Sequence, residues 1–183
     1  MKLRSLILPA AFLASAPAAA EVVEASTTGF TTSDKLAVAA PPDDVWAALI
    51  EPARWWSGAH SWSGDAANLA LEPWAGGCFC ETLPGEGRFP EGSARHMTIV
   101  QAAPGRLLRM SGSLGPLQGE ALSATLSIAL AAAEGGTTIE WTYVVGGHAR
   151  FPLEQVAPAV DGVMTEQLKR LAAFVEGDSA AGE

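Results

Sequence analysis

The stretch Gly76-Gly77-Cys78-Phe79-Cys80-Glu81 closes a segment, residues 54–81, in which the tryptophans of this chain are concentrated. Four of the six tryptophans lie there together with both cysteines: Trp55, Trp56, Trp62 and Trp74, with Cys78 and Cys80. Each tryptophan brings a large apolar surface and one N–H group that needs a partner. A cluster of them just before a Gly-Gly strand start predicts the mouth of a cavity rather than a plain core.

Strand and helix signals precede this segment. Alternating apolar and polar residues predict a first strand over residues 30–39. Pro41-Pro42-Asp43-Asp44 predicts the start of a helix, because proline is tolerated in a first turn and aspartates favour the positive end of the helix dipole. Pro52 ends that helix and begins a second short one that runs through Trp56.

Strands and one long helix follow the segment. Strands are predicted at residues 69–71, 77–83, 96–102, 107–113, 122–130 and 137–145. Because the last of these are consecutive and joined by short turns, we expect an antiparallel meander. Apolar residues then recur every three or four positions up to Val175 and predict a helix. We expect this helix to begin near Pro158, because proline is unfavourable inside a helix.

The first 20 residues have the pattern of a cleavable signal peptide. Lys2 and Arg4 precede a short apolar run, and Ala18-Ala19-Ala20 fits the small-residue cleavage pattern. The run is shorter than the roughly 20 residues of a membrane-spanning helix. The alternative is an uncleaved membrane anchor. We expect cleavage near Ala20, a periplasmic or secreted protein, and no stable membrane anchor afterwards.

The rest of the chain has the length of one domain. We expect a flexible lead-in at residues 21–29, a single domain at 30–176 and a disordered tail at 177–183. The formal net charge of −9, without a basic block, argues against nucleic acid as a partner. Export would place the cysteines in an oxidising compartment.

Four short motifs, in this order, resemble the START-like (SRPBCC) superfamily. They are Ala39-Ala40-Pro41-Pro42-Asp43-Asp44-Val45-Trp46, Glu51-Pro52-Ala53-Arg54-Trp55-Trp56, Gly76-Gly77-Cys78-Phe79-Cys80 and Pro104-Gly105-Arg106-Leu107. The Gly-Gly motif is similar to that of the polyketide cyclase/dehydrase-like and heat-shock ATPase-activator-like branches. The resemblance covers about residues 30 to 176.

The resemblance implies an α+β helix-grip fold. In this fold a curved antiparallel sheet wraps around a long C-terminal helix, two short helices follow the first strand, and a cavity lies between sheet and helix. Members mostly bind apolar or amphipathic small molecules such as lipids, sterols and polyketides. A minority catalyse cyclisation or hydrolysis, and others act as co-chaperones, a role that export makes implausible here.

Cys78 and Cys80 lie two apart in a predicted strand, so their side chains point to one side. Three interpretations remain open. In the first, the cysteines are two buried small apolar side chains. In the second, they form a disulfide near the upper Cα–Cα limit of about 7 Å. In the third, they belong to a metal site with Glu81 and His96 as the nearest further ligands. The first is favoured, because free cysteines are commonly buried.

Glu81 is the acidic residue most suggestive of a site. It shares its strand phase with Phe79, which should face the helix, so its carboxylate would need a partner, with Arg109 and His96 as candidates. The alternative is a carboxylate at a strand edge in solvent. His96 in turn is either a site residue or a satisfied structural histidine.

These observations favour a binding protein over an enzyme, because no catalytic signature motif is present. The leading hypothesis is an exported protein that holds a hydrophobic or amphipathic small molecule, lipid-like or polyketide-like, with no cofactor. The second is a cyclase- or hydrolase-type enzyme with Glu81 and His96 as acid–base residues. The third is a metal or redox role of the two cysteines. The candidate ligand-binding residues are Trp55, Trp56, Trp62, Trp74, Phe79, Glu81, His96, Met110, Trp141 and Met164, although simple packing would also explain the tryptophans.

Overall fold

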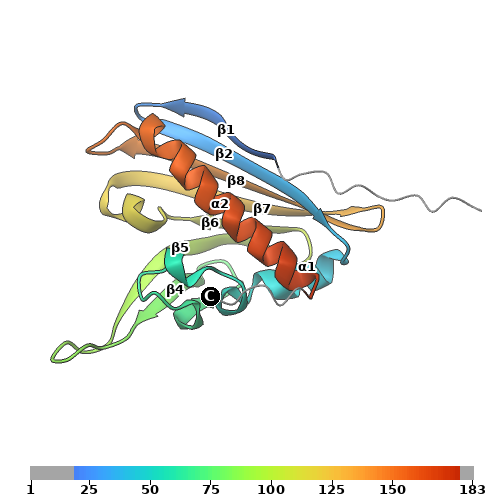
Figure 1. Ribbon diagram of the computed structural model, residues 1–183, viewed down its shortest axis with the longest axis horizontal. Helices are drawn as coiled ribbons and strands as arrows, with labels where there is room; N and C mark the ends of the chain where they lie inside the picture. The colour runs from blue at the N-terminus through green and yellow to red at the C-terminus, as the bar shows by residue number, and fades with distance from the viewer. Residues whose placement is uncertain (1–18, 178–183) are drawn as a thin grey trace, which may run out of the picture.

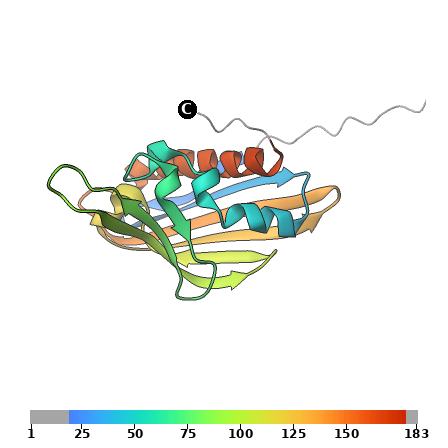
Figure 2. The same ribbon diagram turned by 90° about the horizontal axis from the view of Figure 1, so that it is seen from below.

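The computed structural model describes residues 19–177, in which eight antiparallel strands form one curved sheet and a long helix, α2, crosses one of its faces (Figures 1 and 2). The sheet order is β1-β2-β8-β7-β6-β5-β4-β3, so β2 and β8 are the only neighbours that are not consecutive in sequence among the described strands. The strands are β1 (Ala19–Ser26), β2 (Gly29–Val38), β3 (Leu69–Leu71), β4 (Cys78–Leu83), β5 (Gly92–Ala103), β6 (Leu107–Ser111), β7 (Ala121–Ala133) and β8 (Gly136–His148). The predicted helix-grip architecture and the meander from β3 to β8 are confirmed.

Both α-helices lie on the same side of the sheet (Figure 2). The α-helices are α1 (Pro42–Leu49) and α2 (Leu153–Val175), and the short 3-10 helices are η1 (Pro52–Arg54), η2 (Gly58–His60), η3 (Ala66–Asn68) and η4 (Gly115–Gly119). The two prolines and two aspartates at residues 41–44 begin α1 as predicted, with Pro42 as its first residue.

The core lies between the sheet and α2. Every second residue of β8 is buried, from Thr137 to Val145, which is the alternation that a half-buried strand requires. Leu168 and Leu171 of α2 are completely buried on the opposite side of this core. Burial of each such side chain contributes about 2 kcal/mol to folding. The alternating strands and the apolar face of α2 together therefore stabilise the packing of the helix on the sheet.

The C-terminal half of α2 is tied to the segment that follows α1. Nε of Arg170 donates a hydrogen bond to the carbonyl oxygen of Trp55 at 2.9 Å. The guanidinium group of Arg54 lies 4.5 Å from the ring centroid of Phe174. Trp55 is itself held by its indole N–H, which donates to the carbonyl oxygen of Ala48. These contacts anchor one end of the helix, and the other end lies over the candidate site.

Three predicted boundaries are wrong by four residues or more. Residues 21–26 were expected in a flexible lead-in, but they belong to β1, which pairs with β2 through backbone hydrogen bonds that its polar sequence does not prevent. The long helix begins at Leu153, five residues before Pro158, because Leu153 and Ala157 are completely buried and hold the extra turn on the sheet. Strand β5 begins at Gly92 rather than at His96, because β4 continues to pair with it up to Leu83.

The predicted signal peptide lies outside the described residues, apart from Ala19 and Ala20 in β1, and so does the predicted tail apart from Gly177. Between residues 19 and 177, none of the helices combines the length and the apolar character needed to cross a membrane.

Candidate functional site

A cavity of about 500 Å³ lies beneath the N-terminal half of α2. Its walls come from the loop that contains η2, from the loop that contains η4, from β5 and from the first three turns of α2 with the residues before it. Three of the described polar residues, His60, Ser61 and His96, line the cavity. The other lining residues are apolar or glycine: Trp56, Ala59, Trp62, Leu114, Gly115, Pro116, Leu117, Phe151, Val156, Ala159, Val160, Val163 and Met164. A concave, mostly apolar space of this size is typical of a small-molecule site.

Four of the ten predicted ligand-binding residues line this cavity: Trp56, Trp62, His96 and Met164. Phe79 and Glu81 lie directly behind this wall, since Phe79 contacts the rings of Trp56 and His96 and Glu81 binds His96. The other four lie outside the cavity lining. Trp55, Met110 and Trp141 are buried in the core, and Trp74 is 56% exposed in the turn before β4.

Sequence reasoning missed most of the cavity lining that comes from α2 and from η4. The α2 residues Val156, Val160 and Val163 are part of the apolar stripe that predicts the helix, and their half-buried state marks where the stripe leaves the sheet. The signal that would have found η4 is weak, because Leu114 and Leu117 stand in a glycine-rich loop with no periodic pattern.

Glu81 carries a carboxylate that is almost completely buried, with 1% of the residue exposed. One oxygen accepts a hydrogen bond from the backbone N–H of Ser63 at 2.5 Å, and the other accepts from the N–H of Trp62 at 2.9 Å and lies 2.9 Å from Nε2 of His96. Burial raises the pKa of Glu81, but these hydrogen bonds outweigh it and hold the pKa below its ordinary value. The prediction that Glu81 faces inward with Phe79 is confirmed, and the solvent-exposed alternative is wrong.

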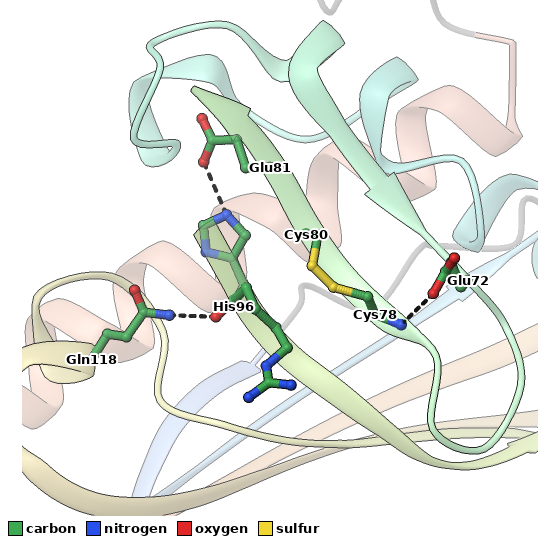
Figure 3. The surroundings of a disulfide bond; sticks show 7 residues. Glu72, Cys78, Cys80, Glu81, His96 and Gln118 are labelled. Carbon is green, nitrogen blue, oxygen red and sulfur yellow. Dashed lines mark hydrogen bonds and ion pairs between the residues drawn. A yellow bond between two sulfur atoms is a disulfide. The ribbon is translucent and has the colours of Figure 1, made fainter. Parts of the chain in front are cut away.

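The partner of Glu81 is His96 and not Arg109. Arg109 donates instead to the side chains of Ser127 and Gln101. Figure 3 shows the His96 ring directed from β5 toward the carboxylate on the neighbouring strand β4.

A β-bulge in β5 places His96 on the cavity side. Phe79 pairs with Met97, but the next residue, Cys80, pairs with Arg95, so His96 is an extra residue opposite β4. Strict alternation would send His96 and Met97 to opposite faces, yet both are buried. Bulges redirect side chains in this way, and here the bulge brings the imidazole into the cavity wall.

The loop at residues 57–63, which covers one side of the cavity, is held from two directions. Toward the sheet, Glu81 binds the backbone of Trp62 and Ser63. Toward α2, the N–H of Ser57 donates to Oε1 of Gln167 at 2.8 Å, and Nε2 of His60 lies 3.1 Å from the carboxylate of Glu166. Hydrogen bonds therefore tie the loop both to β4 and to α2.

The η4 loop is also held at both ends. The hydroxyl oxygen of buried Tyr143 accepts a hydrogen bond from the N–H of Leu114 at 2.9 Å, and burial raises the pKa of Tyr143 to about 12. Arg150 donates to the carboxylate of Glu120 from its backbone N–H, Nε and Nη2, which lowers the pKa of Glu120. Both contacts keep η4 in place at the cavity.

Cys78 and Cys80 form a disulfide (Figure 3). Their Cα atoms lie 5.4 Å apart, closer than in an ideal strand and inside the range that a disulfide can bridge. The favoured interpretation as two free buried thiols is therefore wrong, because this spacing of the Cα atoms brings the two sulfur atoms within bonding reach. The described residues also contain no cluster of three or more histidine, cysteine, aspartate or glutamate side chains placed to hold a metal ion.

The Gly-Gly pair sets the start of β4. Gly76 has a φ of +89°, which an L side chain rarely adopts, and a Cβ atom at Gly77 would collide with the carbonyl oxygen of Glu72. Only glycine at both positions allows this tight turn, and the N–H of Cys78 then donates to the Glu72 carboxylate. The turn fixes where β4 begins and thereby which residues, Phe79 and Glu81, face inward.

The sequence matches the profile of the family described as polyketide cyclase/dehydrase and lipid transport over residues 18–176, and the chain belongs to this family. Of the two branches that the sequence resembles, this match supports the polyketide cyclase-like one. Membership supports a role in binding a hydrophobic ligand or in cyclisation. A comparison with curated proteins found no match.

Solved structures with the same fold share little sequence with this chain. CalU16 from Micromonospora echinospora is 21% identical, with a TM-score of 0.57 over 88% of this chain and 87% of its own. An uncharacterised Rhizobium leguminosarum protein is 18% identical, with a TM-score of 0.58 over 88% and 99%. StfQ, a di-domain aromatase/cyclase of the steffimycin biosynthetic pathway, is 14% identical, with a TM-score of 0.57 over 82% of this chain and 52% of StfQ. These similarities establish the fold alone.

Proposed function

We propose that this protein binds an apolar or amphipathic small molecule in the cavity beneath the N-terminal half of α2. The observation that carries the proposal is the cavity itself, about 500 Å³ in volume, with a lining that is apolar except at three side chains. A lipid-like or polyketide-like molecule would bury most of its surface there, and burial of apolar area contributes roughly 25 cal/mol per Å².

The test is a titration of the purified protein with the uncharged fluorescent probe N-phenyl-1-naphthylamine. Ala159 lines the cavity from α2 and is itself exposed, so Ala159→Trp would place an indole ring at the rim of the cavity. Gln155→Trp is the matched control, because Gln155 is an exposed residue of the same helix outside the lining. We expect the wild type and Gln155→Trp to bind the probe and Ala159→Trp to lose binding. Equal binding by all three, or none by the wild type, would contradict the proposal.

A second candidate function is catalysis of a cyclisation or hydrolysis in the same cavity. It is favoured by the hydrogen bond between His96, which lines the cavity, and the buried carboxylate of Glu81. In this arrangement His96 would be the acid–base residue, and Glu81, which also binds the backbone of the covering loop, would position it. Incubation of the protein with a small-molecule extract of its producing cells, followed by mass spectrometry, distinguishes the two, since a binding protein returns its ligand unchanged and an enzyme converts it.

We propose further that the protein is exported to the periplasm or secreted. The basic residues, the apolar run and the alanines of the first 20 residues support export, and a disulfide between Cys78 and Cys80 is typical of an oxidising compartment. The intact mass of protein isolated from its producing cells tests this proposal. A mass that includes residues 1–20 would contradict cleavage near Ala20.

A further inference from the structure

The His96 ring is held rigidly in the cavity wall. It is 6% exposed, and its ring centroid lies 5.2 Å from that of Phe79. The bulge in β5 orients its backbone, and the carboxylate of Glu81 binds Nε2. A ring fixed on three sides presents its remaining nitrogen, Nδ1, in one direction.

The hydrogen bonds around Glu81 determine which nitrogen of a neutral His96 carries the proton. Two backbone N–H groups, those of Trp62 and Ser63, donate to this carboxylate and can only donate. The carboxylate therefore acts as an acceptor, and its third partner, Nε2 of His96, must be the donor. In the neutral imidazole the other nitrogen, Nδ1, is then an acceptor.

Nδ1 of His96 has no hydrogen-bond partner among residues 19–177. Figure 3 shows one ring nitrogen joined to Glu81 and the other joined to none of the residues drawn. A bound apolar molecule would shield this acceptor from water, so a molecule that donates to it gains over one that does not.

The other two polar side chains of the described lining already have partners. Nε2 of His60 is bonded to Glu166, and Oγ of Ser61 donates to the carbonyl oxygen of Gly58 at 2.9 Å. The His60 side chain is 32% exposed, so water can satisfy its Nδ1, whereas the His96 side chain is only 6% exposed. His96 is therefore the side chain best placed to recognise a polar group on a ligand.

We infer that the cavity selects apolar molecules that carry a hydroxyl group, as a phenol, enol or alcohol, and that this hydroxyl donates its hydrogen bond to Nδ1 of His96. The inference rests on the proposed binding function and defines the class of ligand.

Four probes of one shape test the inference: 1-naphthol, which has the donor; 1-methoxynaphthalene, in which the donor is blocked; naphthalene, which lacks it; and 1-naphthoate, which offers only acceptors. Displacement of N-phenyl-1-naphthylamine gives their affinities. We expect 1-naphthol to bind about tenfold more tightly than the other three, the gain of one hydrogen bond. Equal affinities, or a preference for 1-naphthoate, would overturn the inference and leave the binding function intact. No binding of any probe would contradict the binding function and, with it, the inference.

Variants assign the preference to His96. His96→Phe keeps an aromatic ring but removes Nδ1, so we expect the preference for 1-naphthol over naphthalene to disappear while naphthalene still binds. His148→Phe, at an exposed histidine at the end of β8 outside the cavity, is the control and should keep the preference. A preference unchanged in His96→Phe would overturn the inference. If His96→Phe fails to fold, the comparison of the four probes on the wild type still decides.

Discussion

Nε2 of His96 lies 2.9 Å from the carboxylate of Glu81, a contact between neighbouring strands that also connects the cavity wall to the loop above it. The same carboxylate binds the backbone of Trp62 and Ser63, so a single buried group holds the histidine that faces the cavity and the loop that covers it. The position of the His96 ring in the cavity wall and the position of the loop that covers the cavity therefore both depend on Glu81.

Replacement of Glu81 by glutamine should lower the free energy of unfolding by about 3 kcal/mol, because charge-assisted hydrogen bonds are lost and a buried NH2 group has to face N–H donors. Urea unfolding measures the change. Glu91→Gln, at an exposed glutamate before β5, is the control and should differ from the wild type by less than about 0.5 kcal/mol. Equal stability of the two variants would show that Glu81 does not hold the loop.

Stability should depend on pH through two buried carboxyls that act in opposite directions. The pKa of Glu81 is below its ordinary value of 4.5, so its stabilising effect is present above pH 4.5 and is lost as the pH falls through the lower folded value. Burial raises the pKa of Asp34 above 3.8, despite a hydrogen bond from Thr165. Its contribution is therefore complete below pH 3.8 and is lost as the pH rises through the raised value.

Asp34→Asn separates the two effects. The Asp34 side chain is buried, and its Oδ2 has no hydrogen-bond partner among the described residues. We expect the variant to gain on the order of 1 kcal/mol at pH 7, because a neutral amide is less costly to bury than a charge. The midpoint of unfolding, measured between about pH 3 and pH 7, should then no longer decrease as the pH rises above 3.8. The decrease at acid pH, which Glu81 causes, should remain. A lower stability at pH 7 would contradict this assignment.

Trp62 and Trp74 provide a matched pair, since they are 50% and 56% exposed and only Trp62 lines the cavity. Trp62→Ala should weaken binding of N-phenyl-1-naphthylamine roughly tenfold through loss of aromatic contact, with little change in stability. The variant keeps the backbone N–H that Glu81 binds. Trp74→Ala should bind the probe as the wild type does. Equal effects of the two substitutions would place the binding site elsewhere.

Reduction of the Cys78–Cys80 disulfide should lower stability only modestly, by about 1.5 kcal/mol, because so short a loop restricts the unfolded chain little. Urea unfolding with and without reductant measures this, and the double variant Cys78→Ser/Cys80→Ser should be insensitive to reductant. Rapid alkylation of both cysteines in the unreduced native protein would show that the disulfide is absent.

The order of the main elements after β1 was predictable because its signals are local. Alternation in β7 and β8, the prolines before α1 and the apolar stripe of α2 each depend on a few neighbouring residues. The inward direction of Glu81 was predictable for the same reason, since it shares the phase of Phe79. The start of α2 was not, because the local cost of Pro158 is opposed by burial of Leu153, a contact with distant residues.

The sequence by itself determined the family, the sheet with its helix and the inward face of β4, because short-range periodicity and turn residues specify these features. Only the tertiary structure decided the site. The bulge that turns His96 inward depends on how β5 pairs with β4, and the loop over the cavity depends on hydrogen bonds between residues far apart in sequence, such as Ser57 and Gln167. Pairing between strands and closure of loops are decided by the whole fold, and local residue patterns do not contain them.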